Sequence, residues 1–120
     1  MDVRFTFPKT ERLHYGWQFR LVYERGLCAR GRLLVLYGLV VPGEPRRVGI
    51  VASRRVGNAV ARNRARRLLR EAYRVNKHRL LPNLQMVLVA RSAIVACKLS
   101  EVEADLLELC RNNGLLNTAQ

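Results

Sequence analysis

One segment constrains the fold of this chain more than any other: residues 54–79 combine basic and apolar side chains with a helical period. The apolar residues recur at the spacing of one helix face, and they are Ala61, Ala65, Leu68, Leu69, Ala72 and Val75. The basic residues of the segment are Arg54, Arg55, Arg62, Arg64, Arg66, Arg67, Arg70, Arg74, Lys77 and Arg79. Glu71 is the only acid among them. The pattern predicts a helix over about 59–80, stopped by Pro82, with one buried face and one basic face.

The rest of the chain predicts a sheet and two further helices. In order, the expected elements are a helix at 15–25, a short strand at 27–30, strands at 33–41 and 46–52, the long helix at 59–80, a strand at 86–90 and a helix at 101–112. The order α-β-β-β-α-β-α predicts an α+β two-layer sandwich, and the length of 120 residues predicts one domain over 1–120.

Turn and cap residues refine this prediction. The Pro42–Pro45 turn predicts that the strands on either side of it form an antiparallel hairpin. Ser100 and Glu103 have the spacing of a capping box at the start of the last helix, and Gly114 stands where that helix would end.

The net charge predicts a polyanionic partner. Lys and Arg number 22 against 9 Asp and Glu, a net charge of +13, and 19 of the 22 are Arg. Because Arg binds phosphate in a bidentate manner and stacks on bases, the expected partner is a nucleic acid. Arg62, Arg66, Arg70 and Arg74 recur every four residues, so they form one ridge whose mutual repulsion favours an anion above it. The alternative is a solvated helix face, although such faces usually mix both signs of charge.

The sequence has no recognisable pattern of a protein catalyst or a metal site. Neither His14 nor His78 has a nearby Asp, Ser or Cys in a catalytic arrangement, and no His/Cys spacing suits zinc. The first residues lack the apolar region of a signal peptide, and no apolar run is long enough to span a membrane. The three cysteines, Cys28, Cys97 and Cys110, are expected to be reduced and mostly buried in a cytoplasmic protein.

The stretch Arg47–Arg74, RVGIVASRRVGNAVARNRARRLLREAYR, closely resembles the signature of the bacterial ribonuclease P protein subunit. Arg12-Leu13, the stretch Phe19–Tyr23 and the stretch Val35–Tyr37 match the family's first helix and second strand, so the resemblance covers about 10–112. The departures are Gln85 where the family often has an acid, Tyr23 at the end of the first helix, and Arg54, Arg55 and Arg66 at positions that are often Lys.

The resemblance implies a specific topology. It is a four-stranded sheet packed with three helices, of the ribosomal protein S5 domain 2 type. It includes a left-handed β-α-β crossover through the long helix, although parallel crossovers are usually right-handed. The implied function is the protein subunit of a ribonucleoprotein endoribonuclease that removes the 5′ leader from precursor tRNA. The RNA subunit carries out the chemistry with Mg²⁺, and the protein binds that RNA one to one. The alternative is a ribosomal-type or chaperone RNA-binding protein.

The resemblance also implies two sets of binding residues and no catalytic or metal-ligating residue in the protein. The residues expected to contact the catalytic RNA are Arg54, Arg55, Asn58, Arg62, Asn63, Arg64 and Arg67. Those expected to contact the single-stranded leader of precursor tRNA are Arg12, Phe19, Tyr23, Val35, Tyr37, Val51, Ser53, Arg66 and Arg70. Aromatic rings beside basic groups suit unpaired RNA. As alternatives, Asn63 makes a local helix cap or backbone contact, Phe19 and Tyr37 are core residues, and Tyr15, Trp17 and Tyr73 are packing or rim residues.

Overall fold

The computed structural model describes residues 7–117, and its elements follow the predicted order. The helices and strands are α1 (Gly16–Arg25), β1 (Leu27–Arg30), β2 (Leu34–Val40), β3 (Arg47–Val51), α2 (Ala59–Asn76), β4 (Leu84–Ala90) and α3 (Leu99–Asn112). Short 3-10 turns lie at Lys9–Glu11, Arg54–Val56, Lys77–Arg79 and Ser92–Ala96. The predicted α+β class is confirmed.

The four strands form one sheet in the order β1-β2-β4-β3. β2 pairs with β1 and with β4 in antiparallel fashion, whereas β3 pairs with β4 in parallel. The predicted hairpin between 33–41 and 46–52 is therefore wrong, because β4 lies between these two strands. The chain does turn between these two strands, but a turn does not determine whether the strands on either side of it pair with each other. β4 is buried along almost its whole length, as expected of a central strand.

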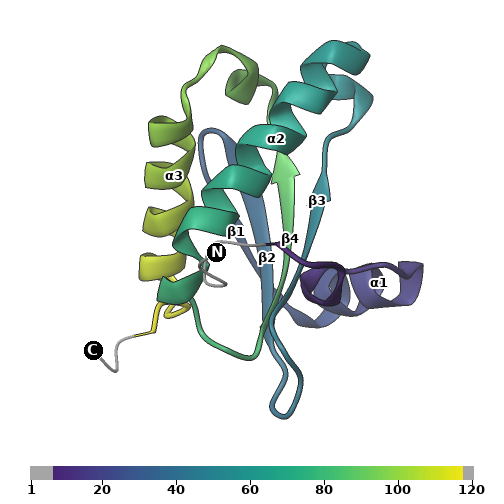
Figure 1. The fold of residues 1–120 in the computed structure, drawn as a ribbon, viewed down its shortest axis with the longest axis vertical. Helices are drawn as coiled ribbons and strands as arrows, with labels where there is room; N and C mark the ends of the chain where they lie inside the picture. The colour runs from purple at the N-terminus through teal and green to yellow at the C-terminus, as the bar shows by residue number, and fades with distance from the viewer. Residues whose placement is uncertain (1–6, 118–120) are drawn as a thin grey trace.

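The connection from β3 through α2 to β4 has the expected left-handed topology. In Figure 1, α2 lies in front of the sheet, β3 and β4 both run upward, and β4 lies to the left of β3. A crossover on the near side that moves leftward is left-handed, opposite to the usual hand.

The two faces of the sheet are covered differently. α2 and α3 pack on one face (Figure 1), where the main hydrophobic core includes Leu36, Leu69, Leu88 and Leu106. Side chains alternate along a strand, so the intervening residues point to the opposite face. There α1 contributes to a smaller cluster formed by Leu13, Val22 and Val87, with Phe19, Tyr37, Val51 and Val89 partly buried around it. We call this second side the open face.

A buried ion pair holds the segment before α1 against α2. The ammonium group of Lys77 lies 2.8 and 3.0 Å from the two carboxylate oxygens of Glu11, and the Lys77 side chain is 5% exposed. The hydroxyl of Tyr73 donates to the same carboxylate at 3.0 Å. Tyr73 is fully buried, so of the alternatives for this residue the structure supports packing. This ion pair lies beside the strand-like bridge between Arg12 and Val48, in the segment that precedes α1.

The helix ends agree with the sequence in part. α2 begins after Asn58, and its end at Asn76 gives way to a 3-10 turn rather than continuing to residue 80. The capping box predicted at Ser100 is wrong, because α3 begins at Leu99 and the carboxylate of Glu101 accepts from the Lys98 N–H at 3.4 Å. Glu103 is engaged elsewhere, accepting from the buried side chain of Asn76 at 2.9 Å.

The cysteines are less uniform than the sequence suggested. All three are free, and Cys97 and Cys110 are buried whereas Cys28 is exposed on β1. Burial raises the pKa of the Cys110 thiol to about 12, so this thiol stays protonated at neutral pH.

Candidate RNA interface

The residues expected to contact the catalytic RNA gather at the N-terminal half of α2 and the turn before it. Arg54 and Arg55 lie on the exposed turn Arg54–Val56, which leads into α2 through Gly57 and Asn58. The apolar side of α2 is buried through Ala65, Leu69 and Ala72. The other side of the helix therefore faces solvent. We call this region the α2 surface: Arg54, Arg55, Asn58, Arg62, Asn63, Arg64 and Arg67.

Several guanidinium groups on and beside this surface are not neutralised by any residue in the described part of the chain. Within residues 7–117, the side chains of Arg54, Arg55, Arg62, Arg67 and Arg70 make no hydrogen bond or ion pair with another described residue. Farther along the same helix, Arg74 is paired with Glu71 at 2.7 Å. An uncompensated group of like charges attracts a polyanion, and each guanidinium fits a phosphate.

Arg64 differs from its neighbours because its guanidinium bonds to the protein backbone. Its Nε donates to the carbonyl of Val95 at 3.0 Å, and its Nη2 donates to the carbonyl of Cys97 at 3.0 Å. These two carbonyls lie at the end of the turn Ser92–Ala96, just before α3. Arg64 thus ties α2 to the segment that follows β4, a role that sequence reasoning did not reveal because its partners lie more than 30 residues away.

The two asparagines of the α2 surface have different local roles. The side chain of Asn58 is the N-cap of α2 and accepts from the Ala61 N–H at 3.0 Å. The side chain of Asn63 accepts from Nη1 of Arg66 at 3.0 Å. Asn63 therefore does make a local contact, but with a neighbouring side chain rather than as a helix cap or with the backbone. In both residues the side-chain carbonyl is occupied within the protein.

The open face carries the aromatic part of the residues expected to contact the leader. Phe19 projects from α1 onto β3 at Gly49, where any larger side chain would collide with its ring. The rings of Tyr23 and Tyr37 meet edge to face, with centroids 4.8 Å apart. Phe19 and Tyr37 are only partly buried, so they belong to the small cluster and still present surface to solvent. Burial, and for Tyr37 the neighbouring Cys28, raises the pKa of both tyrosines, so both hydroxyls stay neutral at physiological pH.

A basic cavity of about 560 Å³ opens at the carboxyl ends of β3 and β4. Val35 and Val89 give it an apolar floor, and Arg30, Arg55, Arg91 and Ser53 stand around it. The cavity brings together Val35 and Ser53, which are expected to contact the leader, and Arg55, which is expected to contact the catalytic RNA. Sequence reasoning missed Arg30 and Arg91. Their position at the end of β1 and directly after β4 was the available signal.

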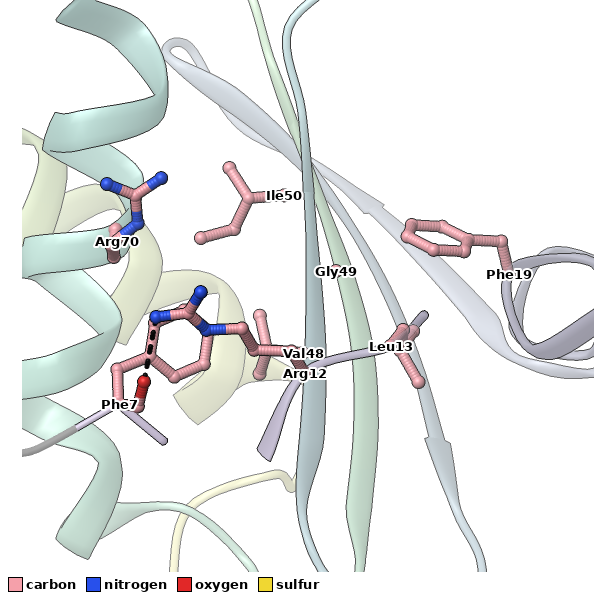
Figure 2. A pocket seen from close by; sticks show the side chains of 8 residues that line it. All are labelled: Phe7, Arg12, Leu13, Phe19, Val48, Gly49, Ile50 and Arg70. Atoms are coloured by element: carbon pink, nitrogen blue, oxygen red, sulfur yellow. Dashed lines mark hydrogen bonds between the residues drawn. The ribbon is translucent and has the colours of Figure 1, made fainter. Parts of the chain in front are cut away.

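The three arginines expected at the leader, Arg12, Arg66 and Arg70, lie along the edge of β3, whereas Val51 belongs to the open face. Figure 2 shows Phe19 on one side of β3 and Arg70 on the other, both lining a hollow of about 170 Å³. Arg12 lies in the same hollow, with its guanidinium 4.7 Å above the ring of Phe7. Arg66 reaches the carbonyl of Ala52 at 3.5 Å, just past the end of β3. The expected leader residues therefore extend from the open face around the edge of the sheet.

This combination defines a class of protein. A small α+β domain carries arginines without a described partner on one helix and the turn before it, and partly exposed aromatic rings on the open face of its sheet, which is chemistry suited to binding RNA.

Comparisons with known proteins give the particular family. Residues 7–113 match the model of the Ribonuclease P family. The chain is 37% identical to the ribonuclease P protein component of Clostridium novyi over 91% of this chain and 98% of that one. It is 34% identical to the protein of the same name from Alkaliphilus oremlandii over 90% and 95% of the two chains. The chain therefore belongs to the ribonuclease P protein component family, whose role is tRNA 5′ leader processing together with an RNA subunit.

Solved structures agree with this assignment. The RNase P protein of Staphylococcus aureus superposes with a TM-score of 0.78 at 25% identity, covering 89% of this chain and 98% of that one. The RNase P protein of Thermotoga maritima gives a TM-score of 0.74 at 27% identity, covering 84% and 96%.

None of the described helices is both long and apolar enough to cross a membrane. Residues 7–117 contain no group of three or more His, Cys, Asp or Glu side chains placed to hold a metal ion.

Proposed function

We propose that the α2 surface binds the catalytic RNA subunit. The observation that carries this proposal is that the guanidiniums of Arg54, Arg55, Arg62 and Arg67 have no partner among the described residues. Because folded RNA offers a dense array of phosphates, these groups would exchange water for charge-assisted hydrogen bonds on binding. Arg64 supports the same surface by fixing the turn beside it.

The open face and the β3 edge would hold the single-stranded 5′ leader of precursor tRNA. Phe19 and Tyr37 offer partly exposed rings, and stacking on such a ring contributes about 1–3 kcal/mol per base. Val35 and Val51 would contact the bases, and Ser53, Arg66, Arg70 and Arg12 would meet the backbone. Tyr23 supports the ring of Tyr37.

In this proposal the protein contributes binding and the RNA subunit contributes the cleavage chemistry. The protein raises affinity for precursor over mature tRNA because only the precursor carries a leader. It also screens the repulsion between two RNA molecules. Mg²⁺ would be held mainly by the RNA subunit, in a complex of one protein with one RNA. A cytoplasmic location fits the three free thiols.

Reconstitution tests the proposal. The full chain is mixed with a bacterial ribonuclease P RNA, and cleavage of a precursor tRNA is followed at low Mg²⁺. The expected result is cleavage at the mature 5′ end that depends on added protein. Equal cleavage with and without protein, at every Mg²⁺ concentration, would contradict it.

A further inference from the structure

Two aromatic rings at the start of α1 belong to neither proposed RNA surface. Tyr15 and Trp17 are 62% and 59% exposed, although Trp is highly buried on average in folded proteins. Gly16 between them has open space around it, with no atom within 4 Å of where a Cβ would lie. The expected packing role does not account for two large rings that both face solvent on either side of Gly16.

The two rings border one continuous region. Tyr15 lines a hollow of about 470 Å³ and Trp17 lines another of about 130 Å³, and both Gln18 and Arg47 line each of them. Gln18 is fixed in place because its Oε1 accepts from the backbone N–H groups of His14 at 2.7 Å and Tyr15 at 2.9 Å. The shared residues make the two hollows parts of a single surface.

The charge of this surface suits a polyanion. Lys9, Arg12 and Arg47 line the hollows, and Glu44 is the only carboxylate among their described lining residues. Glu44 lies 3.3 Å from Arg47 and so offsets one of the three positive charges. Aromatic rings beside cationic groups form a platform on which unpaired bases stack without sequence preference. We call this region the α1 surface: Lys9, Tyr15, Trp17, Gln18 and Arg47.

Arg12 connects the α1 surface to the β3 edge. It lines the hollow beside Tyr15 and also the hollow that contains Phe19 and Arg70 (Figure 2). A strand that leaves Phe19 along this edge would pass Arg12 before it reaches the α1 surface.

We propose that the α1 surface binds single-stranded RNA, and that this RNA is the part of the leader on the 5′ side of the nucleotides held on the open face. Bases stack on Tyr15 and Trp17, while Lys9 and Arg47 meet the phosphates. The inference rests on the proposed function, since it extends the path of the leader. It predicts that affinity rises with leader length beyond the open face.

Trp17 is the only tryptophan in the chain and therefore reports directly on this surface. The full-length protein, assembled with the RNA subunit, is titrated with precursor tRNAs whose leaders are lengthened one nucleotide at a time from the 5′ end. Trp17 fluorescence should be unchanged by mature tRNA and by the shortest leaders. It should be quenched once the leader is long enough to reach the α1 surface.

Three variants separate this surface from the open face. Trp17→Ala should weaken binding of long-leader substrates by about 5- to 100-fold and leave short-leader substrates unaffected. Trp17→Phe keeps a stacking ring and should restore most of the loss. Phe19→Ala should weaken short and long leaders alike. The exposure of Trp17 keeps its substitution out of the core, and thermal unfolding checks that the fold is intact.

Two results would overturn the inference. One is unchanged Trp17 fluorescence at saturation with a long-leader substrate, together with equal affinity of Trp17→Ala at every leader length. The other is quenching by the RNA subunit alone, which would assign the surface to that RNA. If Phe19→Ala also had no effect on any leader, the proposed leader site itself would fail, which is a different outcome.

Discussion

In the function proposed above, the α2 surface and the open face would bind RNA by opposite physical means. The α2 surface is a helix face and its preceding turn, and four of its five guanidiniums, all but that of Arg64, make no hydrogen bond or ion pair with another residue in 7–117. The open face is built from partly buried rings and aliphatic side chains around α1, β2, β3 and β4. The first depends on charge and should respond strongly to salt, and the second depends on contact area and should respond weakly. One small domain can therefore hold two RNA partners through independent interactions.

The largest effect is expected from removing the ion pair between Glu11 and Lys77, which holds the segment that leads into α1. Glu11→Gln would leave the buried ammonium of Lys77 without its carboxylate, which should lower the free energy of unfolding by about 3–5 kcal/mol. Denaturant unfolding measures this loss. Because Glu11 anchors the segment that leads into α1, leader discrimination should fall more than affinity for the RNA subunit. Equal losses in the two would show that the two regions are not independent.

Phe19→Ala should remove one stacking surface and weaken precursor tRNA binding by about 1–3 kcal/mol while sparing mature tRNA. Equilibrium binding of precursor and mature tRNA to the reconstituted complex at two salt concentrations measures this loss. The control is Val60→Ala, because Val60 is highly exposed at the start of α2. The salt dependence of the remaining binding should be unchanged. A similar loss for mature tRNA would exclude Phe19 from a leader site.

Arg67→Ala should weaken binding to the RNA subunit and flatten the log-log salt dependence by about 0.7–0.9 for each phosphate that the side chain neutralises. Its guanidinium has no described protein partner, so the fold should not change. An Arg67→Lys variant serves as the control, because it keeps the charge. A slope unaffected by Arg67→Ala would remove this residue from the interface.

Arg64→Lys should have a smaller and different effect. Lysine keeps the charge but cannot bridge the carbonyls of Val95 and Cys97 as the guanidinium fork does. We expect an almost unchanged salt slope, with faster amide hydrogen exchange in the turn at 92–97. If exchange there matched the unmodified protein while RNA affinity dropped sharply, Arg64 would be an RNA contact rather than a support.

The smallest expected effect is that of pH on the open face. Burial raises the pKa of Tyr23 and Tyr37 in the folded state. Their contribution to stability is therefore fully present below the ordinary tyrosine pKa of about 10 and is lost only as pH rises through the raised values. Unfolding free energies of the protein and of Tyr37→Phe should differ by the same amount at pH 7 and at pH 9. If the difference in unfolding free energy between the two proteins became smaller from pH 7 to pH 9, the hydroxyl of Tyr37 would not be neutral over this range.

The sequence predicted best where the signal is local. The helical period of 54–79 identified α2, and Gly114 marks the end of α3 with φ of +70°. The short strand predicted at 27–30 is present as β1. The prediction failed where the pairing of distant segments decides, because β4 inserts between β2 and β3 and so excludes the predicted hairpin. The predicted capping box failed for a local reason, because α3 begins at Leu99 and Glu101 accepts from the Lys98 N–H. The candidate site shows the same division, since the arginines were found and the link from Arg64 to the turn after β4 was not.

By itself, the sequence determined that this chain forms a basic amphipathic helix within an α+β domain and meets a polyanion, because period and charge are properties of neighbouring residues. Its long motif also identified the family. Only the tertiary structure decided which guanidiniums have no partner within residues 7–117, that Phe19 and Arg70 lie on opposite sides of β3, and that Tyr15 and Trp17 stay exposed. These depend on how segments far apart in the chain pack together, and no local pattern encodes that packing.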